Sequence, residues 1–317
     1  MHIPDGFLDL RTAATAAALA VAGLAYALRD VKRSLPPRRV PLIGLAAAFV
    51  FAAQMLNFPV AAGTSGHLIG AALASVLLGP GAAVVAMTAV LVLQALMFAD
   101  GGITALGANV LNMAVVAPAV AFGVFAALRR LLGRSLRATL LAAGFAAWCS
   151  IVAAAVACAA QLAASGIVDW GTVLPAMAGV HMVIGLGEAV ITMLILAVVL
   201  RARPELLDEV GRVPGTAGVT AAYGLMASVA LVAFVAPLAS SRPDGLEYVA
   251  ERFGFAGFAT VAAEPPLADY SVAALASQSP WLSTAVAGGI GTLIAFGVAW
   301  LVARALTTAG QSAAPHR

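Results

Sequence analysis

Charged residues are scarce in this 317-residue chain, at 10% of the sequence, whereas hydrophobic residues make up 62%. Together with a mean hydropathy of +1.02, this composition excludes an ordinary soluble protein and predicts a polytopic membrane protein. The net charge of +3 does not indicate nucleic-acid binding, because the basic residues gather in short loops rather than on one soluble face. We expect membrane lipid, rather than nucleic acid, to surround the apolar surface of this protein.

Cysteine is also scarce. Cys149 and Cys158 are the two that the sequence contains, and they lie nine residues apart in one apolar segment, about 13.5 Å along a helix. They therefore cannot form a disulfide with each other, and we interpret them as small buried packing residues. The sequence has neither a disulfide framework nor a zinc ribbon. It also lacks the Gly-x-x-x-x-Gly-Lys-Ser/Thr loop of ATPases.

Long apolar runs, in contrast, are abundant. Measured against a hydrocarbon core of about 30 Å, nine runs are candidates to cross it, at roughly 8–28, 41–57, 67–78, 82–99, 107–128, 138–164, 175–200, 218–237 and 282–303. The third run is short and ends at Gly79-Pro80-Gly81, so we expect a tilted or partly re-entrant helix there. The sequence thus predicts an all-α polytopic membrane bundle of about seven helices, followed by an appended module of two helices.

The charged residues predict how this bundle is oriented. Most Lys and Arg residues follow the first, fifth, seventh and ninth runs, which places them on one side if every run crosses. The positive-inside rule makes that side cytoplasmic. Acidic residues, including Asp5, Asp100 and Asp244, gather on the opposite side. We therefore expect the N-terminus outside and the C-terminus inside a bacterial inner membrane.

The first two residues can form a chelate if Met1 is retained, which the bulk of His2 favours. The α-amine, the His2 amide nitrogen and His2 Nδ1 can close two adjacent rings around one cation, with all three nitrogens in one plane. One more imidazole completes a square-planar nitrogen site, which suits Ni(II) or Cu(II), with Co(II) a near relative. Pro4 favours an extended arm.

The alternative reading of this N-terminus is a signal peptide, with Ala-x-Ala sites near Ala18 or Ala25. Against it, Asp5 and Asp9 precede the first base, Arg11, which is the wrong charge for the beginning of such a peptide.

Two further histidines are expected near the outer face. His67 lies in a glycine-rich loop that enters the third run, where it can be the fourth planar ligand or can bond a loop carbonyl. His181 stands seven residues before Glu188, on the same helical face. An acid inside a membrane costs about 2.5–3.5 kcal/mol on insertion scales. We therefore expect a structural or second-shell role for both, with a metal-relay role for His181 as the alternative.

Asp100, Asn109 and Asn112 belong to an outer loop and the helix that follows it. They are candidates to close over the metal site or to hydrogen-bond the N-terminal arm, although asparagine also joins helices in membrane bundles. The His181/Glu188 spacing does not match His-Glu-x-x-His, which disfavours an intramembrane metalloprotease.

Four stretches together resemble the CbiM/NikM substrate-capture subunits of energy-coupling factor (ECF) transporters for cobalt and nickel. They are Met-His-Ile-Pro-Asp-Gly-Phe-Leu at the start, Gly-Thr-Ser-Gly-His-Leu-Ile-Gly over 63–70, Gln-Ala-Leu-Met-Phe-Ala-Asp-Gly-Gly-Ile-Thr-Ala-Leu-Gly-Ala-Asn-Val-Leu-Asn-Met over 94–113, and Gly-Leu-Gly-Glu-Ala over 185–189. Pro-Asp-Gly-Leu-Glu over 243–247 resembles the small CbiN/NikN component.

The resemblance implies a fusion of a metal-binding membrane domain (1–200), a cytoplasmic linker (201–217) and a CbiN/NikN-like module (218–317) that assists metal loading. It implies that Ni²⁺ or Co²⁺ is bound as transported substrate by the Met1 amine, the His2 amide and imidazole, and His67. It also implies partners, a CbiQ/NikQ-like coupling subunit and CbiO/NikO-like ATPases, so the chain itself is not expected to be an enzyme.

A second class of function stays open at this point. A self-sufficient secondary carrier or channel for divalent cations would use Glu188 as its coupling acid. An integral membrane enzyme has little support, because the acids and histidines form no catalytic set. The ligands do not settle nickel against cobalt.

Overall fold

The structure, a computed structural model, describes residues 1–60, 63–203, 217–260 and 265–312. Within these residues, seven segments are long and apolar enough to cross a membrane. They are Leu10–Ser34 (α1), Pro80–Phe98 (α4, Pro80–Leu93, and its last turn), Leu106–Leu132 (α5, Leu106–Asn109, to α6, Ala117–Leu132), Leu136–Ala164 (α7), Trp170–Ala202 (α8), Ala217–Leu238 (α10, Ala217–Phe234, and a 3-10 turn) and Pro280–Thr308 (within α13, Pro280–Ser312). The prediction of a polytopic helical membrane protein is confirmed.

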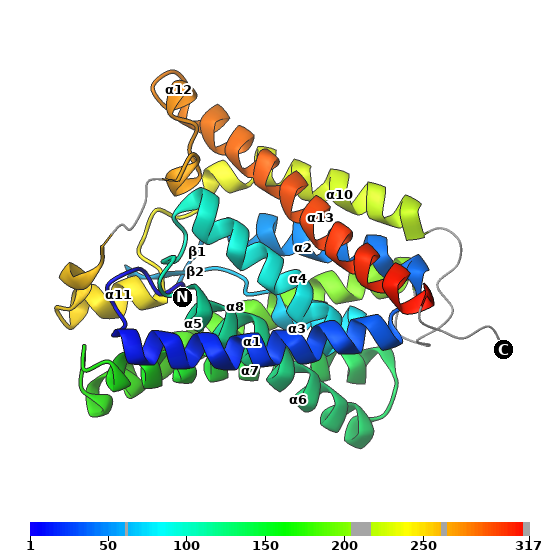
Figure 1. Cartoon of the computed structure of the whole chain (residues 1–317), viewed down its shortest axis with the longest axis horizontal. Coiled ribbons are helices and arrows are strands. Elements are labelled where there is room, and N and C mark those ends of the chain that lie inside the picture. Colours follow the sequence, from blue (N-terminus) through cyan, green and yellow to red (C-terminus); the bar gives the residue numbers. More distant parts are fainter. Residues whose placement is uncertain (61–62, 204–216, 261–264, 313–317) are drawn as a thin grey trace.

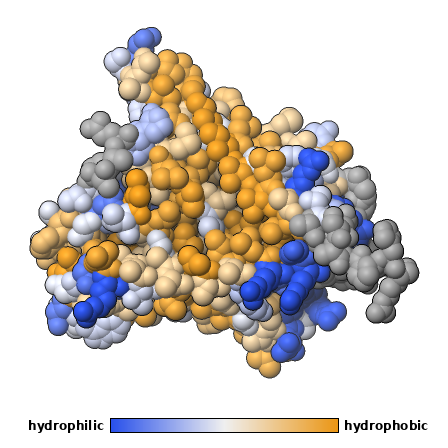
Figure 2. Space-filling view, in the orientation of Figure 1, coloured by the Kyte–Doolittle hydropathy of each residue, from blue (hydrophilic) through white to orange (hydrophobic). Residues whose placement is uncertain are grey.

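Apolar side chains cover the surface between the two ends of the helices, and hydrophilic side chains gather toward those ends (Figure 2). Many large apolar residues of the long helices are exposed, among them Leu186 and Leu194 of α8. Exposed leucines in this number are costly in water but are stable in hydrocarbon, as expected of a chain that crosses a bilayer several times.

Two of the nine apolar runs form shorter helices. α2 spans Val40–Gln54, and α3 spans only Ala71–Leu78. At 1.5 Å per residue, the eight residues of α3 rise about 12 Å, well short of a 30 Å core. An extended segment that leads into α3 includes the strand β2 (Ser65–Gly66), which pairs antiparallel with β1 (Phe58–Pro59). The short third run is therefore a partial helix entered by extended chain, too short to cross the core by itself. Its tilted or partly re-entrant form stays a prediction.

Two π-helical segments flank the loop between α4 and α5. Gln94–Phe98 ends α4, and Val110–Val116 joins α5 to α6. Between them the chain reverses with positive φ at Ala99 (57°) and Gly101 (93°). π-turns widen a helix locally and are often found at functional sites. This loop, residues 99–105, receives the N-terminal arm.

The C-terminal segment, residues 217–312, supplies two long helices and a loop that returns to the N-terminus. α10 and α13 pack against α2, while the intervening α11 (Gly245–Arg252) lies close to the N-terminus and α12 (Ala273–Ala276) precedes α13 (Figure 1). The expected linker, 201–217, falls largely outside the described residues.

Close contact between α13 and the bundle depends on Gly291. A Cβ added there would lie 2.1 Å from Phe51 Cζ and 2.7 Å from Phe98 Cζ, whereas one added at Gly289 would meet open space. We expect Gly291→Ala to destabilise the chain by about 1–3 kcal/mol through overpacking. Gly289→Ala, in the same helix, should be neutral or stabilising by up to about 1 kcal/mol. Thermal unfolding in detergent measures both, and equal midpoints would contradict the packing seen here.

Candidate metal centre

The N-terminal arm, residues 1–9, folds back into the bundle as a non-helical segment with a β-bridge between Asp5 and Thr260. Ile3 is completely buried, and its backbone pairs with the side chain of Asn109: Ile3 N–H donates to Oδ1 (2.8 Å) and Asn109 Nδ2 donates to Ile3 O (3.0 Å). Gly102 N–H donates to the same carbonyl at 2.8 Å. These bonds replace the water that the arm would otherwise bind, so they determine where Met1 and His2 lie.

Asp5 anchors the middle of the arm to loop 99–105. Its carboxylate accepts hydrogen bonds from Thr104 N–H (2.7 Å) and from the Thr104 hydroxyl. A Cβ at Gly102 would lie 2.3 Å from the Asp5 nitrogen, so the arm approaches loop 99–105 as closely as glycine allows. Contact with the arm is one of the roles that the sequence left open for Asn109, whereas the role of Asp5 was not foreseen.

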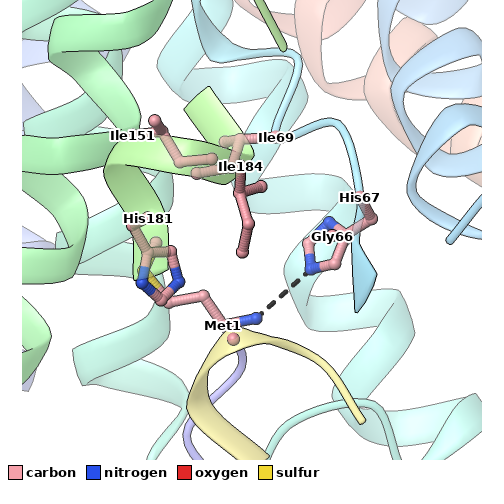
Figure 3. A pocket seen from close by; sticks show the side chains of 8 residues that line it. Met1, Gly66, His67, Ile69, Ile151, His181 and Ile184 are labelled. Atoms are coloured by element: carbon pink, nitrogen blue, oxygen red, sulfur yellow. Dashed lines mark hydrogen bonds between the residues drawn. The ribbon is translucent and has the colours of Figure 1, made fainter. Parts of the chain in front are cut away.

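His67 faces the first atom of the chain. Its Nε2 lies 3.2 Å from the Met1 amine nitrogen, and its Nδ1 lies 3.3 Å from Leu68 O. Figure 3 shows the amine and the ring turned toward one another. Burial lowers the pKa of His67 to about 3, aided by the positive charge of the nearby amine. The ring is therefore neutral near pH 7, and the nitrogen facing the amine can offer a lone pair.

His2 lies beside His67, with the two rings stacked at 5.5 Å between centroids and 19° between planes. Its Nδ1 is 2.8 Å from Asp100 Oδ1. His2 Nε2 is buried and has no hydrogen-bond partner within the described part of the chain. Burial would raise the pKa of Asp100, but the His2 imidazole and its hydrogen bond outweigh burial and leave that pKa below its usual range.

A carboxylate from the C-terminal segment completes the surroundings of the amine. Asp244 Oδ2 forms an ion pair with the Met1 ammonium and lies 3.9 Å from His67 Nε2. Burial lowers the pKa of the Met1 amine, but the charge of Asp244 and its hydrogen bond more than offset this and raise it overall. The amine therefore holds its proton more tightly than a free terminus does.

Local structure fixes the direction of the Asp244 side chain. Its other oxygen, Oδ1, caps α11 by accepting from Leu246 N–H (2.8 Å) and Glu247 N–H (2.9 Å), and Glu247 accepts from Asp244 N–H in return (2.8 Å). This is a capping box, which orders the first turn of a helix. The preceding residue is anchored as well, because Pro243 O accepts from Ser65 N–H at 2.8 Å, two residues before His67.

His181 lines a small cavity of about 10 Å³ together with Met1 and His67 (Figure 3). That volume is roughly enough for one water-sized particle. Its Nδ1 lies 2.8 Å from Met177 O, one turn earlier in α8. The His181 side chain borders the same cavity as Met1 but makes no hydrogen bond or ion pair with Met1, His2 or His67.

Glu188 and Asn112 lie away from the amine. The Glu188 carboxylate accepts Ile69 N–H (2.9 Å) and Gly70 N–H (3.1 Å), which stabilises the backbone that follows His67. Asn112 exchanges two hydrogen bonds of 2.8 Å with Gln161 of α7. Glu188 therefore stabilises the backbone after His67, and Asn112 joins two helices, which is one of the roles left open for it.

Two residues near the site were missed from the sequence, Asp244 and Tyr270, whose hydroxyl donates to Asp100 Oδ2. The Asp-x-x-Glu spacing of 244–247 is a capping-box signature, so the cap itself was detectable. Nothing in the local pattern reveals that the second oxygen of Asp244 reaches residue 1.

Comparison with known proteins identifies the family of this chain. Residues 2–206 match the model of the family CbiM, cobalt uptake substrate-specific transmembrane region, and residues 219–308 match the PDGLE domain. The chain belongs to the CbiM family.

Two of the similar relatives are named as fused proteins. A putative fused nickel transport protein NikMN of Archaeoglobus fulgidus is 42% identical over 211 residues, which cover 66% of this chain and 68% of the relative. The fused nickel transport protein NikMN of Rhodobacter capsulatus is 39% identical, over 65% of this chain and 64% of that protein. A cobalt transport protein CbiM of Moorella thermoacetica is 38% identical over 45% of this chain and 56% of that protein.

Two solved structures of transition metal transporters are similar to this chain. A crystal structure of a transition metal transporter matches with a TM-score of 0.59 and 36% identity, covering 65% of this chain and 95% of that one. A truncated transition metal transporter matches with a TM-score of 0.57 and 38% identity, covering 64% and 99%. This CbiM-family chain is a multi-pass membrane protein of metal uptake.

Removing the amide of Asn109 tests how the arm is positioned. Asn109→Ala leaves the Ile3 N–H and C=O without their side-chain partner, at about 1–3 kcal/mol for an unsatisfied buried group. We expect hydrogen exchange at Ile3 to accelerate about tenfold or more. Asn112→Ala, which breaks the bond to Gln161, is the matched control and should leave the arm protected. Equal protection of Ile3 in both variants would contradict this account of the arm.

Proposed function

We propose that this CbiM-family chain is the substrate-capture membrane subunit of an ATP-driven importer of the ECF type for Ni²⁺ or Co²⁺. The metal ligands are the Met1 amine, the His2 amide nitrogen and imidazole, and His67. The observation that carries the proposal is the 3.2 Å approach of the Met1 amine to His67 Nε2, with the His2 ring stacked on His67. Three nitrogen-bearing groups from two distant parts of the sequence thus meet at one buried point.

The chemistry of this donor set suits a late first-row metal. Amine, amide and imidazole nitrogens of residues 1 and 2 form adjacent chelate rings, and His67 supplies a neutral imidazole opposite them. An all-nitrogen planar site suits Ni(II), with Co(II) close to it. Within the described residues, no three His, Cys, Asp or Glu side chains are grouped to hold a metal. A site based on the N-terminal backbone does not need such a group.

The proposal also includes an orientation in the membrane and a division of the chain into domains. The N-terminus and α11 lie at one end of the bundle, and the C-terminal ends of α1 and α13 lie at the other (Figure 1). Because the basic residues after the first, fifth, seventh and ninth runs mark the cytoplasmic side, the arm faces outward. The chain divides into a metal-binding domain (1–200), a cytoplasmic linker (201–217) and a CbiN/NikN-like module (218–317).

The energy source lies on other subunits. No ATP-binding Gly-x-x-x-x-Gly-Lys-Ser/Thr loop occurs in the sequence. A CbiQ/NikQ-like coupling subunit and CbiO/NikO-like ATPases are the proposed partners. A secondary carrier driven through Glu188 is less well supported, because that carboxylate accepts two backbone hydrogen bonds beside His67.

Metal titration of the purified chain tests the ligand set. We expect one Ni²⁺ per chain with the native N-terminus, and loss of that binding both when one glycine precedes Met1 and in His67→Ala. His316→Ala, in the polar C-terminal tail, controls for the removal of a histidine. Binding that survives both the extension and His67→Ala would move the search to His181. Uptake by vesicles that hold the chain with and without ATPase partners separates an importer subunit from a self-sufficient carrier.

The affinity for Ni²⁺ should rise with pH. The Met1 amine has a raised pKa, so below that pKa the metal must displace its proton, and it must also displace the proton of the His2 amide. His67, with a pKa of about 3, contributes nothing to this dependence near neutrality. Two displaced protons predict an increase of up to about a hundredfold per pH unit. Titrations from about pH 6 to about pH 8 measure the slope, and a flat profile would argue against an amine and amide chelate.

A further inference from the structure

Tyr270, like Asp244, belongs to the C-terminal segment. Asp244 contacts Met1, whereas Tyr270 contacts Asp100. Its hydroxyl donates to Asp100 Oδ2 and accepts from Gln94 Nε2 at 3.1 Å. Its ring stacks on Phe98, with centroids 4.8 Å apart and planes at 24°. The loop that carries it is joined to the same region by Leu267 N–H, which donates to Met97 O at 2.9 Å.

The backbone at this point is strained. Asp269 and Tyr270 are consecutive non-glycine residues with positive φ, at 53° and 54°. Each such conformation is unfavourable for a residue with a Cβ and persists only where the surroundings fix it. In this backbone conformation the Tyr270 ring stacks on Phe98 and its hydroxyl donates to Asp100. These two contacts accompany the unfavourable φ angles.

Asp100 contacts both Tyr270 and His2. One carboxylate oxygen accepts from Tyr270, and the other lies 2.8 Å from His2 Nδ1. A carboxylate can only accept hydrogen bonds, so Nδ1 carries the proton in this arrangement. His2 Nε2 finds no hydrogen-bond partner among the described residues. Tyr270, Asp100 and His2 therefore form one chain of hydrogen bonds that ends on a proposed metal ligand.

We propose that Tyr270 is a positioning residue for the metal site, acting through Asp100 to set the orientation of the His2 ring. This inference rests on the proposed function. When Nδ1 turns to the metal, Nε2–H becomes the ring donor that a carboxylate can accept. In the structure Asp100, held by the Tyr270 hydroxyl, lies 2.8 Å from His2 Nδ1. Once Nδ1 turns to the metal, the same carboxylate would accept the hydrogen bond from Nε2–H. Carboxylate partners of this kind orient ligating histidines and increase their basicity.

Equilibrium Ni²⁺ titration of the full chain tests the proposal. Tyr270→Phe keeps the stack on Phe98 and removes the hydroxyl, so we expect affinity to fall about threefold to tenfold with one metal still bound per chain. Asp100→Asn should weaken binding by about tenfold to a hundredfold. Tyr248→Phe is the matched control, because it removes a hydroxyl of α11 that bonds Arg252 Nη1 (2.8 Å) rather than Asp100, and it should bind as the unaltered chain does.

The double variant distinguishes positioning from a general loosening of the loop. If Tyr270 acts through Asp100, adding Tyr270→Phe to Asp100→Asn should have little further effect. Full additivity of the two losses, or unchanged affinity in Tyr270→Phe, would overturn the inference. Failure of the proposed function looks different: the unaltered chain would then bind no metal, or His67→Ala would bind as well as the unaltered chain, and the inference would fall with it.

Discussion

The buried α-ammonium of Met1 is the charge on which the arrangement of this end of the molecule depends. An unpaired charge is costly away from water, so the amine must find partners of the right kind. It finds the Asp244 carboxylate and the neutral ring of His67. Those two partners come from the C-terminal segment and from the extended chain before α3, so a single terminal group joins three distant parts of the sequence.

Several polar backbone groups lie outside regular helices near the Met1 amine, and buried side chains pair with them. The π-helical turns around loop 99–105 end two spanning segments at the level of the arm, and Asn109 substitutes for a neighbouring strand. Glu188, in the middle of α8, performs the corresponding task for the chain after His67. Asn109 and Glu188 therefore pair with backbone that no regular helix or sheet satisfies here.

Much of this could be predicted from the sequence, and the rest could not for a physical reason. Composition and apolar runs predict the helices because burial in a bilayer depends on local hydrophobicity alone. Pro4 and the Met-His pair predict an extended arm with grouped nitrogens, and the arm is extended. The bond between His2 Nδ1 and Asp100, and the ion pair of Asp244, depend on contacts across 98 and 243 residues, which no local pattern encodes. For Glu188, the cost of burial was apparent but its backbone partners were not.

The separation in sequence of these contacts has a consequence for biosynthesis. Synthesis runs from the N-terminus, so the arm is made well before Asp244, before Thr260, which pairs with the Asp5 backbone, and before Tyr270. Contacts between residues so far apart form late in folding. The Met1 amine therefore lacks its carboxylate partner until the 243 residues that lead to Asp244 have been made. This end of the molecule can be completed only after the C-terminal segment has joined the bundle.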